Sequence, residues 1–158
     1  DVGGRGVRPR AIITTLLFLA LVAAEGARKH HPHHGNHSAN MNLTALASTY
    51  FEVWNAHDVA GLEGLLAVDA TLRDWDISKS GGKEVAEANG GIFKAVPKIA
   101  IEVLQYHLSE ATSTVSCEIL VKLNNATAEN PTGDVLKVVD IITYDAEGKI
   151  KSVRAYKG

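Results

Sequence analysis

Apolar side chains recur along residues 41–158 with two different periods, which predict helices first and strands later. Leu43, Ala47, Tyr50 and Trp54 follow one another at intervals of four, three and four residues, so they lie along one side of an α-helix. Later segments alternate apolar and polar residues, and residues two apart share one face of a strand. The predicted order is helix, helix, strand, helix and four strands, over residues 43–57, 58–66, 70–76, 83–95, 98–108, 113–123, 135–144 and 149–156.

Strands that follow helices and are joined by short loops are typical of the α+β class, in which helices pack on one face of an antiparallel sheet. A long sheet with a strong twist curls, and helices can close its hollow side. We therefore expect a cone-shaped, curved antiparallel sheet closed by the N-terminal helices, over residues 42–158. Such a cone can contain a small apolar ligand.

Three polar side chains interrupt apolar faces of these elements. Tyr50 lies on the helical stripe, and Asp74 alternates with Ala70 and Leu72. Asp140 lies on the aliphatic face of a strand, where its neighbours are Leu136, Val138, Ile142 and Tyr144. A carboxylate in apolar surroundings is costly as an anion and tends to stay protonated. Two carboxyls and a phenol that converge in one hydrophobic hollow predict a proton-transfer site.

Each of these three residues also has a structural interpretation. Asp140 would bind backbone donors or a partner subunit, because buried ionisable groups are often structural. Tyr50 would be a core tyrosine whose hydroxyl has a hydrogen-bond partner. Asp74 would end its strand and begin a turn.

Five further side chains are predicted to line the substrate pocket: Trp54, Trp75, Phe93, Tyr106 and His107. The alternative for the four aromatic residues is a place in the core, and for the histidine a position at the rim or at an interface. Cys117 alternates with Val115 and Ile119 and is interpreted as a small buried hydrophobe.

Charge argues against one class of partner. The whole chain has 16 basic and 18 acidic residues, and subtracting the five and two in the first forty leaves 11 and 16 in residues 41–158. Phosphate binding needs clustered positive charge, so nucleic acid is not an expected partner. Histidines crowd residues 30–37 without a helical or strand spacing, which indicates a linker rather than a metal site. We expect neither a metal nor a cofactor.

The first forty residues differ from the rest. Three arginines precede the apolar run 11–24, which is shorter than the roughly 20 residues that span a bilayer. A positive flank, a short apolar run and small residues before Glu25 predict a secretory signal peptide over residues 1–24, followed by a histidine-rich linker over 25–41. The protein is then exported, whereas translation from Met41 would leave it in the cytoplasm. No integral membrane segment is expected in residues 42–158.

Two stretches are similar to a known superfamily. Tyr50–Asp58, Tyr-Phe-Glu-Val-Trp-Asn-Ala-His-Asp, with Asp69–Asp74 after it, resembles the opening of the ketosteroid isomerase and SnoaL-like polyketide cyclase families. Val138–Ile150 resembles the last hairpin of the nuclear-transport-factor-2-like superfamily, to which they belong. The resemblance covers residues 43–158. It implies a cystatin-like cone and a homodimer formed through the exposed face of the sheet.

The resemblance also implies roles, since Tyr50, Asp74 and Asp140 occupy the positions of the isomerase site residues. Asp74 would remove a proton α to a carbonyl and return it elsewhere, while Tyr50 and protonated Asp140 would donate hydrogen bonds to the dienolate oxygen. Arg73 could pair with Asp74 or Asp76 and weaken the base. Dehydratase or hydrolase chemistry would need a further base, for which His107 is the histidine candidate in the strands.

The predicted function is therefore cofactor-independent proton transfer on a small apolar carbonyl compound, an isomerisation or a cyclisation. The alternative is a non-catalytic domain of the same fold that binds a small ligand or another protein.

Overall fold

The computed structural model describes residues 41–158, and the predictions for residues 1–40 lie outside the described residues. The elements are α2 (Leu43–Asn55), α3 (Val59–Leu65), β1 (Leu66–Arg73), β2 (Ser78–Ser80), α4 (Gly82–Ala95), β3 (Ala100–Ser109), the 3-10 turn η2 (Glu110–Thr112), β4 (Thr114–Lys122), β5 (Val135–Tyr144) and β6 (Ile150–Lys157). Within residues 41–158 no helix has the length and apolar character that crossing a membrane requires.

Side-chain caps fix where the first two helices begin. The Asn42 Oδ1 atom accepts a hydrogen bond from the Ala45 N–H at 3.0 Å, and Asp58 Oδ1 accepts one from the Gly61 N–H at 2.9 Å. Such caps satisfy N–H groups that have no partner within the helix. The chain reverses between the two helices at His57, whose φ is 55°.

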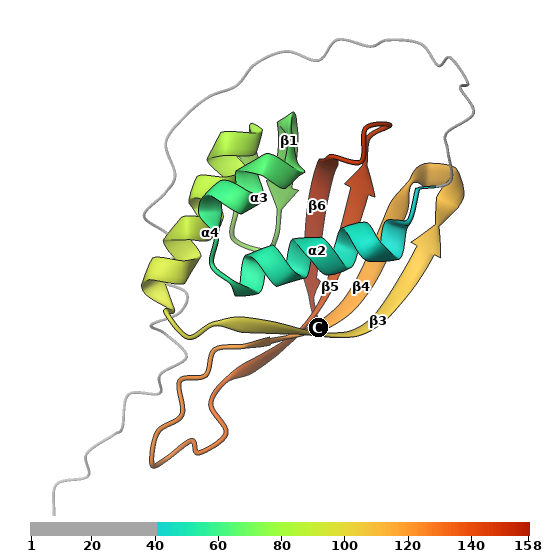
Figure 1. Cartoon of the computed structure of the whole chain (residues 1–158). Coiled ribbons are helices and arrows are strands. Elements are labelled where there is room, and N and C mark those ends of the chain that lie inside the picture. The colour runs from blue at the N-terminus through green and yellow to red at the C-terminus, as the bar shows by residue number, and fades with distance from the viewer. Residues whose placement is uncertain (1–40) are drawn as a thin grey trace, which may run out of the picture. The chain divides into compact units, whose positions relative to one another are not determined.

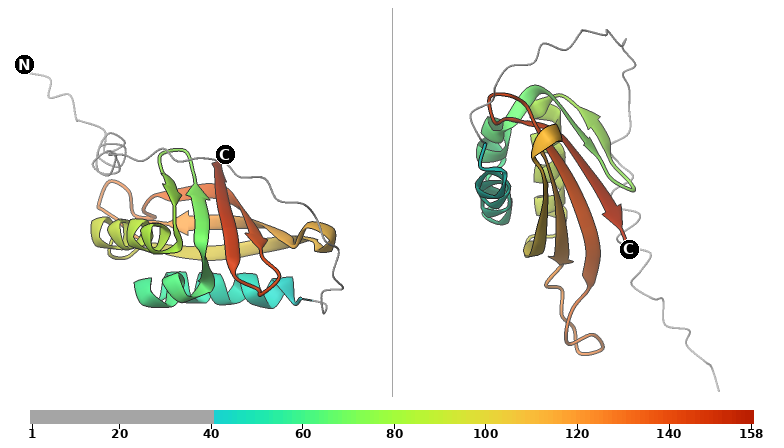
Figure 2. Two further views of the ribbon diagram at one scale, coloured as in Figure 1. Left: turned by 90° about the horizontal axis from the view of Figure 1, so that it is seen from above. Right: turned by 90° about the vertical axis from the view of Figure 1, so that its right-hand side faces the viewer.

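The six strands form one sheet in the order β2-β1-β6-β5-β4-β3. Neighbouring strands run antiparallel except β1 and β6, which are parallel. Figures 1 and 2 show that the sheet is curved and that α2 and α4 pack against it. The predicted α+β fold, with a curved sheet closed by N-terminal helices, is confirmed.

The core lies between the helices and the sheet face that they cover, which we call the inner face. The largest wholly buried side chains are Leu62, Val85, Val115, Cys117, Ile142 and Ile150. One buried hydrogen bond joins α2 to α4, from Trp54 Nε1 to Asn89 Oδ1 at 2.8 Å. This bond satisfies an indole N–H that would otherwise be costly to bury.

The first strand begins earlier than residue 70 and has an unpredicted partner. Its pairing with β6 is interrupted between Leu66 and Thr71, and the Val68 side chain is 92% exposed. The irregular stretch breaks the alternation of apolar and polar residues, so only the second half of the strand shows the pattern of a strand. The three-residue strand β2, Ser-Lys-Ser, has no apolar residue to reveal it.

The third helix, α4, runs without interruption through Gly90 and Gly91, although glycine has a low helix propensity. Gly90 is buried, and a Cβ atom there would lie 3.1 Å from Val59 Cγ2. The glycine therefore lets α4 approach the start of α3 closely, and this packing offsets the helix propensity that a glycine loses.

A β-bulge in β3 changes which side chains face inward. The register with β4 shifts between Val103 and Gln105, with Leu104 as the extra residue. Because one extra residue reverses the alternation, the side chains that follow exchange faces. Tyr106 consequently lies opposite Cys117 on the inner face, and His107 lies opposite Ser116 on the other.

Candidate active site

Asp140 lies in the middle of β5 on the inner face. Its neighbours across the sheet are Cys117 on β4 and Ala155 on β6. The residue is only 6% exposed. Burial, and secondly the charge of Asp74, raise the pKa of the Asp140 carboxyl to about 7. A protonated carboxyl is therefore present at and below neutral pH, and it can donate a hydrogen bond.

Tyr50 lies on the buried side of α2 and is 5% exposed. Burial raises the pKa of its hydroxyl well above the usual value, and the Asp140 charge raises it further. The phenol thus stays protonated and remains a donor. Because the charge of Asp140 raises the pKa of the Tyr50 hydroxyl, the two groups lie near each other in the fold, although ninety residues separate them in sequence.

Asp74 follows the last residue of β1 and is half-buried. Its Oδ1 atom accepts hydrogen bonds from the backbone N–H groups of Asp76, at 2.7 Å, and of Ile77, at 2.5 Å. The structure therefore shows the predicted turn-forming role of this side chain. Its Oδ2 atom forms no hydrogen bond within residues 41–158, so one carboxylate oxygen is left for other partners.

Arg73 does not pair with the acids beside it. Among the described residues it forms no ion pair with Asp74 or Asp76, unlike the pairing that the sequence allowed. Arg73 is the last residue of β1, and in the turn that follows Asp74 Oδ1 is held by the N–H groups of Asp76 and Ile77 instead. Leu72 next to it is buried on the inner face, while the Arg73 side chain is exposed.

A pocket of about 350 Å³ opens where β1 and β6 separate. The pairing of these strands ends at Arg73 with Arg154, and the residues beyond diverge. The lining residues are Arg73, Asp74, Trp75, Ala155, Tyr156 and Lys157. We call this cavity the β1–β6 pocket. The pocket contains one acid, Asp74, and its lining residue Ala155 is the cross-strand neighbour of the other, Asp140.

The five predicted pocket-lining residues fall into four different positions. Trp54 and Phe93 are buried in the core between α2 and α4, with ring centroids 4.9 Å apart, and neither lines the β1–β6 pocket. Trp75 is 42% exposed and does line it. Tyr106 is half-buried on the inner face. His107 is exposed and bonds Glu118 at 2.8 Å, so it is not brought to the acids.

Three further groups surround the site. Tyr144 is on the same face of β5 as Asp140, and its Oη atom is sealed from solvent without a hydrogen-bond partner in the described residues. Spacing could have indicated Tyr144, since it lies four residues after Asp140 on one strand. No spacing in the sequence indicates that Lys157 lies in the pocket. Cys117 is buried as expected, and burial, then Asp140, raise its thiol pKa to about 12, which keeps it un-ionised.

No metal centre is visible in the part of the chain that the structure describes. There, no three His, Cys, Asp or Glu side chains are arranged to hold a metal ion.

Comparisons with known proteins agree with this fold. Residues 47–153 match the model of the SnoaL-like domain. A protein with a cystatin-like fold from Methylobium petroleophilum is 15% identical, with a TM-score of 0.64 over 76% of this chain and 78% of its own. A nuclear-transport-factor-2-like protein from Cytophaga hutchinsonii is 12% identical, with a TM-score of 0.59 over 76% and 93%.

A third solved structure is a protein with a ketosteroid isomerase-like fold from Catenulispora acidiphila, in complex with trimethylamine. It is 13% identical, with a TM-score of 0.60 over 70% of this chain and 83% of its own. Among curated proteins, none matches the chain. At these identities the solved structures establish the fold and leave the activity open.

Proposed function

The chain belongs to the family of SnoaL-like domains, and on that premise we propose that it catalyses cofactor-independent proton transfer on a small apolar carbonyl compound. Isomerisation and cyclisation are the two outcomes of such a transfer. The proposal gives Asp74 the role of general base and gives Tyr50 and Asp140 the role of hydrogen-bond donors to the carbonyl oxygen.

One observation carries the proposal: a buried carboxyl with a pKa of about 7 lies within the electrostatic reach of both a buried phenol and a second carboxylate. A base must be ionised, while a donor acid must be neutral, so the two carboxyls need different environments. Asp140 is enclosed by the sheet and α2, whereas Asp74 is half-buried at a pocket. The difference in environment supports the difference in role.

The reaction is balanced without an oxidant or a reductant. The Asp74 carboxylate takes a proton from the carbon next to the carbonyl, and the C–H electron pair forms an enolate. Tyr50 and protonated Asp140 stabilise the charge that develops on the enolate oxygen, where preorganised donors are most effective. Protonated Asp74 then returns the proton to a different carbon, or the enolate carbon attacks a second carbonyl of the same molecule.

Removing the Tyr50 hydroxyl tests the donor role. We expect Tyr50→Phe to slow the exchange of the α-protons of cyclohexanone in deuterated water by about 10²–10³-fold, the effect of losing one donor to a developing oxyanion. Proton NMR follows the exchange. The matched control is Thr49→Val, which deletes an exposed hydroxyl of the same helix and should leave the rate close to wild type. Equal rates for Tyr50→Phe and the wild type would refute the role.

A non-catalytic ligand-binding domain is the second candidate, and one observation favours it. Both backbone hydrogen bonds to Asp74 Oδ1 hold a turn, which is a sufficient structural reason for this residue. The trimethylamine complex of the Catenulispora protein supports small-molecule binding by this fold. In that case ligand affinity should survive both Asp74→Asn and Asp140→Asn, and no exchange should be detected.

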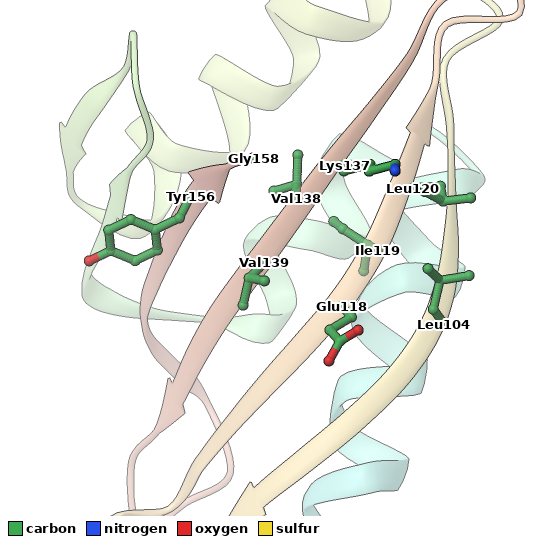
Figure 3. Close-up of a pocket in the computed structure, with 9 residues that line it drawn as sticks. All are labelled: Leu104, Glu118, Ile119, Leu120, Lys137, Val138, Val139, Tyr156 and Gly158. Atoms are coloured by element: carbon green, nitrogen blue, oxygen red, sulfur yellow. The ribbon is translucent and has the colours of Figure 1, made fainter.

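We also propose that the protein is a homodimer that pairs through the sheet face opposite the helices. A groove of about 310 Å³ crosses this face, lined by Leu104, Glu118, Ile119, Leu120, Lys137, Val138, Val139, Tyr156 and Gly158, and we call it the outer-face groove (Figure 3). Leu104 and Tyr156 are 52% and 55% exposed. The groove holds both Glu118 and Lys137, and a two-fold axis that sets each against the other's copy would pair unlike charges.

Placing a charge in the outer-face groove tests the pairing. Val139→Asp should convert the dimer into a monomer, because an unpaired carboxylate would be buried against an apolar surface. Sedimentation velocity measures the mass. The control is Val68→Asp, which changes a 92% exposed valine outside the groove and should leave the dimer intact. A wild-type protein that sediments as a monomer at all concentrations would contradict the proposal.

A further inference from the structure

The β1–β6 pocket contains two cations that have no anionic partner. Arg73 and Lys157 both line it, and within residues 41–158 neither forms an ion pair. The turn that follows the last residue of β1 forms this pocket. Asp74 draws the backbone into a tight turn at its own side chain, so β1 diverges from β6 after Arg73. The two cations are thus brought to one cavity from strands that are far apart in sequence.

One of these cations is already held in place. Lys157 Nζ lies 5.3 Å from the centroid of the Trp75 ring, within the range of a cation–π interaction. This contact orders the lysine side chain, so less conformational entropy remains to be lost when an anion binds. Trp75 and Tyr156 add aromatic surface beside the charges. The pocket therefore combines an ordered positive group with a surface suited to the apolar part of a ligand.

The acid in the pocket does not cancel this positive charge. Arg73 and Lys157 contribute two positive charges and Asp74 contributes one negative charge, which leaves the lining with a formal charge of +1. In addition, two backbone N–H groups are directed at Asp74 Oδ1, and they stabilise its charge locally. The lining is thus net positive beside Asp74, the residue assigned as the base.

We propose that the β1–β6 pocket binds a carboxylate, so that the substrate is a keto acid: its carbonyl end lies toward Tyr50 and Asp140, and its carboxylate end lies between Arg73 and Lys157. This inference rests on the proposed function, because it names the substrate class for the same site. It also gives the ligand a direction, because Ala155 lines the pocket and is the cross-strand neighbour of Asp140. The apolar centre of the molecule then lies against Trp75, Ala155 and Tyr156, and its charge lies between the two exposed cations.

A matched pair of ligands tests the inference. Levulinate and methyl levulinate have the same ketone and differ in the carboxylate charge. At low salt the wild type should bind levulinate about five- to tenfold more tightly than the ester, the effect of one or two solvent-exposed ion pairs, and the preference should shrink as salt is added. Chemical-shift titration by NMR gives both dissociation constants. Lys157→Met and Arg73→Met should each reduce the preference, while Lys151→Met, a control at an exposed lysine of β6 outside the pocket, should not.

The outcomes separate this inference from the proposed function. Equal affinity for the acid and the ester, or a Lys157→Met variant that weakens both equally, would overturn the carboxylate site. Exchange of cyclohexanone protons is measured on the same samples. A preference for the carboxylate without any proton exchange would support the carboxylate site and refute the proposed catalysis. Proton exchange without that preference would support the catalysis and refute the carboxylate site.

Discussion

Replacing Asp74 with asparagine should lower the rate of α-proton exchange on cyclohexanone by about 10²–10⁴-fold, the usual contribution of a positioned general base. Asparagine has nearly the same shape, and its Oδ1 atom can still accept the hydrogen bonds from the N–H groups of Asp76 and Ile77. The turn at the end of β1 is therefore preserved, while the ability to take a proton is lost. The rate measured by proton NMR in deuterated water is the readout.

The matched control for this variant is Asp76→Asn. Asp76 is exposed, lies two residues away and is not part of the lining of the β1–β6 pocket. The Asp76→Asn variant removes the same charge from the same turn. We expect its exchange rate to be within a factor of about two or three of wild type, because a solvent-exposed charge is well screened. If both variants slow the exchange equally, the effect is one of local charge, and Asp74 is not the base.

The second large effect concerns Asp140 and pH. In an unfolded chain an aspartic acid has a pKa of about 3.9, whereas in the folded protein burial raises the pKa of Asp140 to about 7. Between these two values the folded state holds a proton that the unfolded state has released. The free energy of unfolding must then fall as the pH rises through this window, by on the order of 4 kcal/mol in all, and the loss is complete above about pH 7.

Asp140→Asn isolates this contribution, because asparagine is neutral at every pH. Denaturant unfolding of the two proteins at several pH values gives the difference in free energy. We expect the difference to shift in favour of the variant as the pH rises from about 4 to 7, while the other carboxyls cancel in the comparison. A difference that stays constant across this range would show that the carboxyl is ionised throughout, which would remove the basis for its role as a donor.

The same variant gives a second signature in the exchange assay. Wild-type exchange should decline as the pH rises through about 7, because Asp140 loses the proton that it donates to the carbonyl oxygen. Asp140→Asn keeps an N–H donor and should lose this decline while retaining part of the rate. An unchanged decline in the variant would assign the titration to a different group.

The sequence predicts the buried acid and phenol well because regular elements place them. Tyr50 follows the period of an α-helix without interruption, and β5 begins and ends where the alternation of its residues indicates. Asp140 then faces inward because it lies two residues from Val138 and two from Ile142, which are buried on the same face of the strand. Alternation with Ala70 and Leu72 adds the third residue, Asp74. The resemblance to the isomerases correctly identifies the fold.

Irregular geometry explains what the sequence does not predict. The bulge at Leu104 reverses the faces of Tyr106 and His107, and no residue pattern marks the extra position. The β1–β6 pocket depends on a parallel pairing between strands about eighty residues apart and on the place where that pairing stops. Local periodicity contains no information about either, so the role of Lys157 becomes visible only when the strands are assembled.

Tyr156 lines both the β1–β6 pocket and the outer-face groove. If copies of the chain associate through the groove, one side chain is shared between the contact that joins the subunits and the cavity that receives the ligand. Association and ligand binding are then linked thermodynamically, and any change in affinity that one causes in the other is reciprocal. The protein concentration at which the subunits associate would therefore change with the ligand concentration.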